Sequence, residues 1–571
     1  MEAIELVLYL SVITSLQITG LNAYDIYVSH HGYDSESCGD SLQNACSSVL
    51  HAVNTRSKDN DSVLIDGTFW GTSSAVYVES TVFLNKSLRF KGISGKPALQ
   101  CNNCNINFVI TSPQPYRKDR TVEVSFDNTL LNGTNRKGLF TKVVSVKDAS
   151  VRFSNCEISS GQPGVYYQCE YGCQLTVEKT IFSHNREGLC VHAFGEGSSI
   201  LQVSIRNSAF LGENGRSKYA LKYCIVGTHT ECASGIYGNH NIDIHIYNSR
   251  FQYFESGINV GIGAYGRLNM TISDCTFRNI GIFRESDGAV FISYQGVGDP
   301  DKFLNFVVRN SVFTNNAAAS GAGINLYTVY PLSLTVLDSV FTNNKASLQG
   351  GAVCSYGPNK VSIYRCRLEY NSCDLPKASD VVETGYGGAL AFVGPKDCVA
   401  KVFVNRSTFV SNTARALGGT LYSNLRPSEI ELSEVSIESS HWHTNRAVEG
   451  DMIYSMSKMA LKNVSVVSSA HETNAIFINN DVISVDRLTK FQCPIGFFVS
   501  LAAVQSQSND SATKSFSLFS IKCEMCSYNH YSLFPSVFFE QRTNNSNCHL
   551  CSPGGICASG LTRPKNNFWG F

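Results

Sequence analysis

Short runs of alternating apolar and polar residues recur through most of the chain. One unit of eight residues describes them: apolar, any, apolar, any, polar, small, any, bulky apolar, as in Val151-Arg-Phe-Ser-Asn-Cys-Glu-Ile158. The alternation at its start predicts a strand with one buried face. The polar and small residues predict a bend, because Asn and Asp tolerate tight backbone and bond their own main chain. The bulky residue then points inward on a second short strand.

Twelve copies of this unit are present, and consecutive copies start 24 to 41 residues apart. They begin at Val124, Val151, Leu175, Val203, Ile244, Met270, Phe306, Leu334, Val361, Val402, Val435 and Val464. The sixth position is small in every copy, ending with Ser469, and the eighth is bulky, ending with Trp442 and His471. Several short strands at this spacing predict the turns of a β-solenoid, in which equivalent residues stack. Helical repeats are disfavoured, because no 3.6-residue periodicity is present.

Two further motifs follow the bulky residue. The first, F-x-x-N, occurs at Phe313–Asn316, Phe341–Asn344 and Phe409–Asn412, and the second, G-G-A-[LV], occurs at Gly350–Val353 and Gly387–Leu390. This pairing resembles the repeats of polymorphic outer-membrane-protein-type β-helices and, more broadly, the pectin-lyase-like superfamily. The resemblance covers about residues 60 to 490 and implies an all-β fold, a right-handed single-stranded parallel β-helix followed by a small cysteine-rich region. It does not supply a substrate.

The ends of the chain predict a secreted protein with capped repeats. We expect a signal peptide at 1–23, an N-terminal cap of a strand and a short helix at 24–60, the β-helix at 61–490 and a cysteine-rich segment at 491–571. The apolar run Leu6–Leu16 has signal-peptide length, although Glu2 and Glu5 stand where basic residues are usual, and a buried first strand or helix is the alternative. No later stretch reaches 18 apolar residues. Glycosylation sequons lie at Asn60, Asn85, Asn132, Asn269, Asn405, Asn463, Asn509 and Asn544.

The 21 cysteines divide by their place in the repeat. Cys156, Cys275 and Cys366 occupy the small position, which predicts buried thiols. The other 18 could pair fully. The disulfide candidates are Cys38 with Cys46, Cys169 with Cys173, Cys224 with Cys232, and Cys493, Cys523, Cys526, Cys548, Cys551 and Cys557 in the C-terminal segment. Zinc is the alternative for the two C-x-x-C pairs, but disulfides are favoured in a secreted chain.

Charge and local chemistry indicate no enzyme class. The 46 basic residues balance the 46 acidic ones, which excludes a typical nucleic-acid binder. The outward second and fourth positions of the unit carry no carboxylates in adjacent turns, as general acid/base catalysis would need; the other faces are not tested by this pattern. No cofactor is indicated; Asp299 and Asp301 could help hold calcium, but a turn is favoured.

Two histidine patterns have the spacing of possible sites. His441 and His443 flank Trp442 like a metal pair, but Trp442 fills the bulky position and leaves them simply outward. Asp243 and His245 form an outward acid–base pair without a nearby nucleophile. No catalytic, cofactor or metal residue is therefore predicted.

Two functions remain. The first is a non-enzymatic secreted or cell-surface β-helix protein with an adhesive, recognition or structural role and an extracellular protein or glycan as partner. The second is a carbohydrate-active enzyme or polysaccharide-binding protein that uses a different face. Stacked carboxylates in neighbouring turns would favour the second. The chain ends without a membrane anchor, so we expect a secreted product or a truncated form of an anchored protein.

Overall fold

The repeat units form stacked parallel strands in the computed structural model. It describes residues 23–564 except 68–75, 79, 102–103, 114–120, 134–141, 194–199, 214–216, 226–240, 263–266, 282–285, 295–303, 375–384, 396–398, 426–432, 469–473, 506–512, 533–547, 553–554 and 559–560. The signal peptide, Cys232, Asp299, Asp301, Asn509 and Asn544 thus lie outside the described residues. The chain divides into two compact units, Met1–Tyr166 with Leu175–Thr180, and Tyr167–Gln174 with Ile181–Phe571.

Each turn contributes a strand to three parallel ladders, which we name in chain order. The opening ladder contains the strand that starts the repeat unit. The aromatic ladder contains the short strand with the bulky residue, and the closing ladder contains the strand that follows it in the chain. In the first unit the opening ladder is β1 (Asp25–Val28), β2 (Asp61–Ile65), β5 (Leu88–Gly92), β8 (Glu123–Asp127), β11 (Ser150–Ser154) and β14 (Gln174–Glu178). The aromatic ladder is β3 (Val76–Val78), β6 (Ala98–Cys101), β9 (Leu130–Asn132) and β12 (Glu157–Ser159), and the closing ladder is β4 (Val82–Leu84), β7 (Ile106–Thr111) and β10 (Lys142–Lys147). The boundary between the units falls within β13 (Val165–Cys169).

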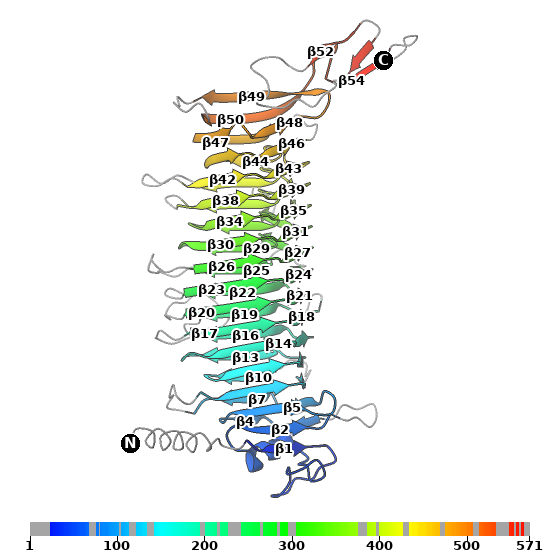
Figure 1. Ribbon diagram of the computed structural model, residues 1–571, viewed down its shortest axis with the longest axis vertical. Helices are drawn as coiled ribbons and strands as arrows, with labels where there is room; N and C mark the ends of the chain where they lie inside the picture. The colour runs from blue at the N-terminus through cyan, green and yellow to red at the C-terminus, as the bar shows by residue number, and fades with distance from the viewer. Residues whose placement is uncertain are drawn as a thin grey trace, which may run out of the picture. The chain divides into compact units, whose positions relative to one another are not determined.

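The second unit continues the same order over more turns (Figure 1). Its opening ladder is β17 (Ile200–Arg206), β20 (Asn241–Tyr247), β23 (Arg267–Ser273), β26 (Leu304–Arg309), β30 (Leu332–Leu337), β34 (Lys360–Tyr364), β38 (Lys401–Asn405), β42 (Glu434–Glu438) and β45 (Lys458–Lys462). Its closing ladder is β16 (Glu187–Ala193), β19 (Tyr219–Ile225), β22 (Ser256–Ile262), β25 (Gly288–Tyr294), β29 (Ile324–Thr328), β33 (Val353–Tyr356), β37 (Leu390–Gly394), β41 (Leu421–Leu425) and β44 (Ile453–Ser455).

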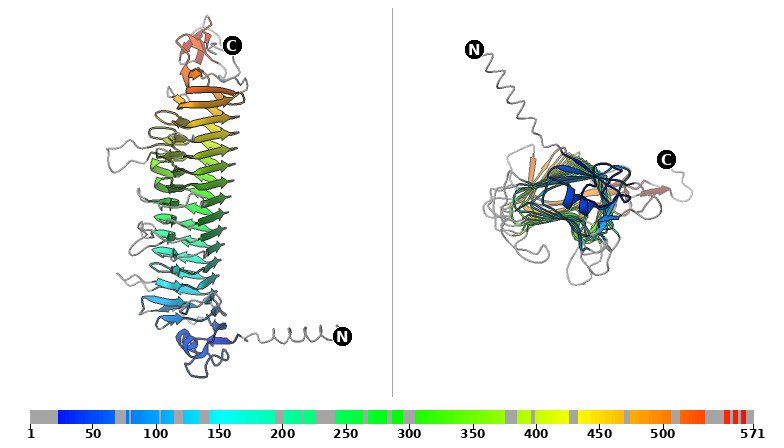
Figure 2. Two further views of the ribbon diagram at one scale, coloured as in Figure 1. Left: turned by 90° about the vertical axis from the view of Figure 1, so that its left-hand side faces the viewer. Right: turned by 90° about the horizontal axis from the view of Figure 1, so that it is seen from below.

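Three-residue strands make up the aromatic ladder of this unit. They are β15 (Ile181–Ser183), β18 (Ala209–Leu211), β21 (Arg250–Gln252), β24 (Thr276–Arg278), β27 (Val312–Thr314), β31 (Val340–Thr342), β35 (Arg367–Glu369), β39 (Thr408–Val410), β43 (His441–His443), β46 (Ser465–Val467) and β48 (Lys490–Gln492). Four turns add a fourth ladder, β28 (Ala317–Ser320), β32 (Lys345–Gln349), β36 (Ser372–Cys373) and β40 (Thr413–Ala414). Stacked parallel ladders of this kind define a right-handed single-stranded parallel β-helix, as predicted. The stacked strands of the unit are seen from a second side in Figure 2.

The polar fifth position of the repeat makes the predicted bend. Asn128, Asn248 and Asp338 have φ of 53°, 44° and 50°, and even Lys179 and Arg365 take up the left-handed conformation there. Asn and Asp adopt this conformation most readily among residues with a side chain, which explains their preference for this position.

The sixth and eighth positions form the interior. Ser311 at the sixth position is buried, and its hydroxyl accepts a hydrogen bond from the backbone N–H of Cys275, one turn earlier, at 3.2 Å. The bulky residues stack ring on ring: the centroids of Phe251 and Phe277 are 4.7 Å apart, and those of Phe313 and Phe341 are 4.6 Å apart. Burying each ring contributes roughly 2 to 3 kcal/mol, so this column is a main source of stability.

The final Asn of F-x-x-N, and the Asn at the same place after Leu368 and Trp442, form a buried hydrogen-bonded ladder. Each side-chain amide before the last donates to the next Asn along the stack, at 2.9 to 3.0 Å. The members are Asn316, Asn344, Asn371, Asn412 and Asn445. Their Oδ1 atoms also accept backbone N–H groups, so the ladder satisfies main-chain groups where the chain turns.

The predicted start of the twelfth repeat copy is wrong. Met459 pairs in register with Val435, so this copy begins at Met459, not at Val464. Val464 occupies the small position, and Val466 takes the bulky position opposite Trp442. Ser469 and His471 lie outside the described residues. The error arose because Val464 and Ser469 also satisfy the template, which specifies residue classes and not register.

Different elements close the two ends. At the N-terminus, α2 (Val49–His51) and η1 (Ala52–Arg56) follow β1. At the C-terminus, β50 (Thr513–Met525) pairs antiparallel with both β47 (Asn474–Asp486) and β49 (Phe497–Gln505). Two antiparallel pairs of short strands follow, β51 (His530–Tyr531) with β52 (His549–Leu550), and β53 (Gly555–Ala558) with β54 (Leu561–Pro564). Within the described residues, no helix is both long and apolar enough to cross a membrane.

Candidate functional site

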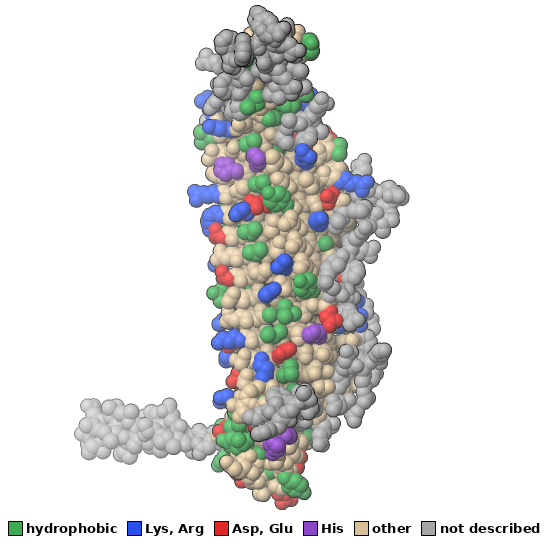
Figure 3. Space-filling view, turned by 90° about the vertical axis from the view of Figure 1, so that its right-hand side faces the viewer, with side chains coloured by type: hydrophobic (Ala, Val, Ile, Leu, Met, Phe, Trp, Pro, Cys, Tyr) green, Lys and Arg blue, Asp and Glu red, His purple; other side chains and the backbone are tan. Residues whose placement is uncertain are grey.

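The outer face of the opening ladder carries few acids. On the described strands β17 to β45, the outward carboxylates are Asp243, Glu434 and Glu438. Asp243 and Glu434 are separated by several turns, and Glu438 lies four residues from Glu434 along β42, so none has a carboxylate on the adjacent strand. This face therefore offers no acid pair for catalysis. On the face shown in Figure 3, basic and acidic side chains are interspersed and do not gather by sign.

The Asp243–His245 pair is present but exposed. His245 Nε2 lies 3.0 Å from Asp243 Oδ1, and Asn269 Nδ2 donates to the same oxygen at 2.9 Å. Asn269 is also a sequon residue and is exposed, as is Asn463, whereas Asn405 is half-buried and donates to Glu438 at 3.2 Å. This arrangement has the character of a solvated polar surface.

A shallow hollow of about 270 Å³ lies farther along the opening ladder, over β34, β38 and β42. It is lined by Lys360, Val361, Ser362, Lys401, Val402, Phe403, Glu434 and Ser436. Glu434 is the acidic residue among them, and its Oε2 atom lies 3.8 Å from Nζ of Lys458. The hollow offers contacts for a ligand but no acid–base pair.

His441 and His443 do not form a metal pair with further ligands among the described residues. Trp442 is 1% exposed and stacks against Phe409 at 4.6 Å, while the two histidines remain exposed on either side. The structure thus places Trp442 in the interior column, as the repeat predicts.

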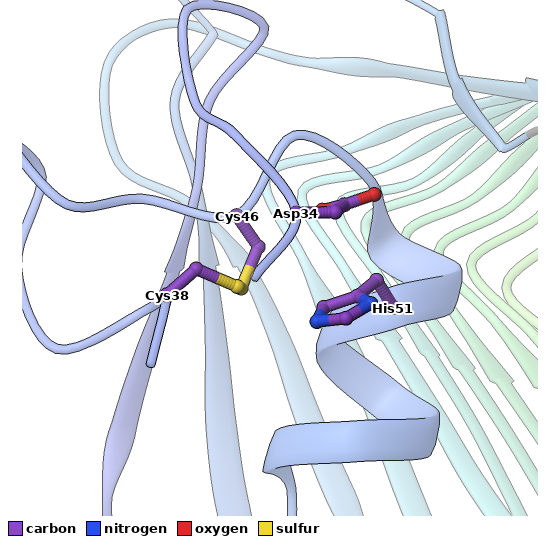
Figure 4. Close-up of side chains that lie close together, drawn as sticks. All are labelled: Asp34, Cys38, Cys46 and His51. Carbon is purple, nitrogen blue, oxygen red and sulfur yellow. A yellow bond between two sulfur atoms is a disulfide. The ribbon is translucent and has the colours of Figure 1, made fainter. Parts of the chain in front are cut away.

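The N-terminal cap brings Asp34, Cys38, Cys46 and His51 within ligand-like distance of one another (Figure 4). The two sulfurs form a disulfide of 2.05 Å and are not thiolate ligands. Asp34 accepts hydrogen bonds from Ser47 N and from Ser48 N and Oγ, and His51 Nε2 lies 2.9 Å from Ser35 O. These contacts hold the cap together, and the donor set does not fit a metal ion.

The structure joins most of the disulfide candidates. Besides Cys38–Cys46, the pairs are Cys169–Cys173, Cys493–Cys523, Cys526–Cys548 and Cys551–Cys557. The pairing uses the sulfurs that a zinc site would need. A further disulfide joins Cys101 and Cys104, which was not predicted. The predicted partner of Cys224, Cys232, lies outside the described residues.

Full pairing of the remaining 18 cysteines is a wrong expectation. Cys156, Cys275 and Cys366 are buried thiols as predicted, but Cys190, Cys354 and Cys373 are thiols too. Cys354 and Cys373 lie outside the small position of the repeat, so their state could not be predicted from that pattern.

The closing ladder holds the acid pair that the opening ladder lacks. Glu187, Tyr219, Ser256 and Gly288 are in register on β16, β19, β22 and β25. The residues immediately before them form one column of charged side chains on four successive turns: Arg186, Lys218, Glu255 and Asp287. Glu255 and Asp287 therefore stand on adjacent turns, whose strands are about 4.8 Å apart.

The surroundings of Asp287 raise its pKa. Burial raises the pKa of Asp287, the negative charge of Glu255 raises it further, and a hydrogen bond from Asn259 opposes the shift. Asn259 Nδ2 donates to Asp287 Oδ2 at 2.7 Å and fixes the carboxyl group. A carboxyl group with a raised pKa beside a second carboxylate is an arrangement used for general acid catalysis.

A signal for this column was present in the sequence. In later turns the same position is the first glycine of G-G-A-[LV] or its variants, at Gly321, Gly350, Gly387 and Gly418, three residues before the in-register strand residue. Aligning this motif backward along the chain places Asp287 and Glu255 in the glycine position. The outward second and fourth positions of the unit belong to a different ladder and could not reveal them.

Comparison with known proteins gives similarity at the level of solved structures. No family model matches the sequence, and no curated protein matches it. A GH136 lacto-N-biosidase from Eubacterium ramulus is 12% identical over 68% of this chain and 64% of that chain, with a TM-score of 0.33. A rhamnogalacturonan lyase is 12% identical over 73% and 90%, with a TM-score of 0.26. The bacteriophage CBA120 tailspike protein 3 is 11% identical over 79% and 61%, with a TM-score of 0.27. The chain thus spans less than two thirds of the lacto-N-biosidase.

Proposed function

We propose that the protein is a carbohydrate-active β-helix protein that cleaves a glycosidic bond over the closing ladder. The observation that carries this proposal is the stacked pair Glu255 and Asp287, with the pKa of Asp287 raised. Asp287 would protonate the leaving oxygen, and Glu255 would act as nucleophile or base on the sugar. Retaining glycosidases hold two carboxyl groups roughly 5 to 5.5 Å apart, a separation that adjacent turns can provide. Arg186 and Lys218 continue the column and would contact neighbouring sugar units.

The proposal includes a secreted or cell-surface location. The disulfides in the cap and in the C-terminal segment support an oxidising compartment. We also propose kinship with the polymorphic outer-membrane-protein-type repeats, supported by the Asn ladder and by the left-handed Gly350 and Gly387 of the G-G-A motif. Glycans at the described sequons Asn60, Asn85, Asn132, Asn269, Asn405 and Asn463 remain predictions.

The test is a polysaccharide-turnover screen with the secreted, disulfide-formed chain, read as new reducing ends. We expect Asp287→Asn and Glu255→Gln each to lower turnover by at least about 100-fold, because general acid–base groups contribute that much or more. Asp243→Asn is the matched control, since Asp243 is an outward acid on the opening ladder, and it should leave turnover unchanged. Equal turnover in all four proteins, or loss in the control as well, would contradict the assignment.

A non-enzymatic adhesive or recognition role is the second candidate. It is favoured by the opening-ladder face, where Lys360, Lys401 and Phe403 line a hollow without an acid pair. A glycan array run beside the turnover screen separates the two functions. Binding without turnover of any polymer would support recognition, and binding lost in Phe403→Ala but kept in Asp287→Asn would locate it on the opening ladder.

A further inference from the structure

Cys190 and His192 form a thiol–imidazole pair outside the acid column. Both lie on β16, two residues apart, and therefore point to the same face of the closing ladder. Cys190 Sγ lies 3.0 Å from His192 Nε2, within hydrogen-bonding distance. Cys190 is 5% exposed and His192 is half-buried, so the pair sits at the surface layer and not in the interior of the helix.

The other thiols have a different environment. Cys156, Cys275 and Cys366 donate to backbone carbonyl oxygens, and burial raises the pKa of Cys275 and Cys366 to about 12. Burial also raises the pKa of Cys354 to about 12 and that of Cys373 further. A carbonyl cannot take up the thiol proton, whereas an imidazole can. Cys190 is thus the described thiol with a base at hydrogen-bonding distance.

The backbone register gives the positions next to this pair on the neighbouring strand. On β19, Lys222 is in register with Cys190 and Cys224 with His192. On β16 itself, Glu187 lies three residues before Cys190. Of β13, the residues Tyr167–Cys169 belong to the same unit as β16. Among these three, the half-buried residue is the neutral Gln168.

We propose that Cys190 is a nucleophilic thiol, activated by His192, which exchanges with small-molecule disulfides such as oxidised glutathione. The proton of Cys190 passes to His192 Nε2, and the thiolate attacks one sulfur of the disulfide. A bond forms between Cys190 and that sulfur, the disulfide bond breaks, and the leaving thiolate takes the proton from His192. The product is Cys190 in mixed disulfide with one glutathione and one released glutathione thiol, so no other oxidant is needed.

The test measures alkylation and exchange of each cysteine in the native full-length chain. Iodoacetamide labelling is followed by peptide mass spectrometry from pH 5 to pH 9, and oxidised glutathione is used in a parallel series. We expect Cys190 to label, with a midpoint below the usual thiol value of about 8.5, and to gain one glutathione. Cys156, Cys275, Cys354, Cys366 and Cys373 should label only after denaturation.

His192→Gln isolates the imidazole, because glutamine can occupy the space without accepting a proton at this pH. We expect labelling of Cys190 to slow about tenfold at pH 6.5 and to approach the wild-type rate at pH 9. His245→Gln, which removes an outward histidine from the opening ladder, is the control and should leave the profile unchanged. The proposal fails if Cys190 is unlabelled in the native chain, or if its pH profile is the same in His192→Gln. A Cys190→Ser chain that still gains glutathione would also overturn it.

Discussion

One column of the closing ladder carries charged residues in some turns and glycine in others. In the turns of β16 to β25 it carries Arg186, Lys218, Glu255 and Asp287, and from β29 onward it carries glycine. Gly350 and Gly387 have φ of 61° and 69°, and a Cβ at Gly387 would collide with the carbonyl oxygen of Leu390. The regular turns are therefore closed so tightly that no side chain fits. The candidate acid pair lies in turns that admit a side chain at this position.

The largest expected effect is that of Gly387→Ala. The methyl group would meet backbone atoms at a left-handed position, so we expect a loss of about 3 kcal/mol or more in unfolding free energy. Asp287→Ala at the equivalent position should change it by less than about 1 kcal/mol, because that turn already holds a side chain. Urea unfolding of the full chain measures both, and equal losses would remove the distinction between the two kinds of turn.

The Asn ladder provides the next test, since it too belongs to the regular turns. Asn371 accepts from Asn344 N and Nδ2 and donates to Phe341 O and Asn412 Oδ1. Asn371→Ala leaves several of these buried groups unpaired, which should cost about 2 to 3 kcal/mol. Asn269→Ala, at an exposed site, should cost less than about 0.5 kcal/mol. If thermal unfolding shows no difference between the two variants, the ladder is not a stabilising element.

The smallest effect concerns the acid pair. Because the pKa of Asp287 is raised in the folded protein, the folded state binds its proton more tightly than the unfolded chain. Stability should therefore decrease as pH rises from below the ordinary value of 3.8 through the folded pKa. Asp287→Asn should flatten this part of the curve of unfolding midpoint against pH. An unchanged slope would indicate that Asp287 titrates normally.

The regular part of the molecule was predictable from the eight-residue unit, and the candidate site was not. Residue classes alone locate the bend at Asn310, the buried Ser311 and the inward Phe313, since each position has one physical requirement in every turn. Glu255 and Asp287 become neighbours only through the register of β22 and β25, which residue classes do not specify. The Cys190–His192 pair lies on a strand for which the eight-residue unit makes no statement.

The reversed direction of β50 has a consequence for assembly. Each parallel turn presents an edge that is a template for another strand of the same direction, and stacked folds can in this way extend from chain to chain. Because β50 runs antiparallel to β47 and is covered in turn by β49, the template is not copied. The antiparallel strands β49 and β50 thus block the addition of further parallel strands. We expect a chain cut before residue 490 to form fibres under conditions in which the intact chain does not.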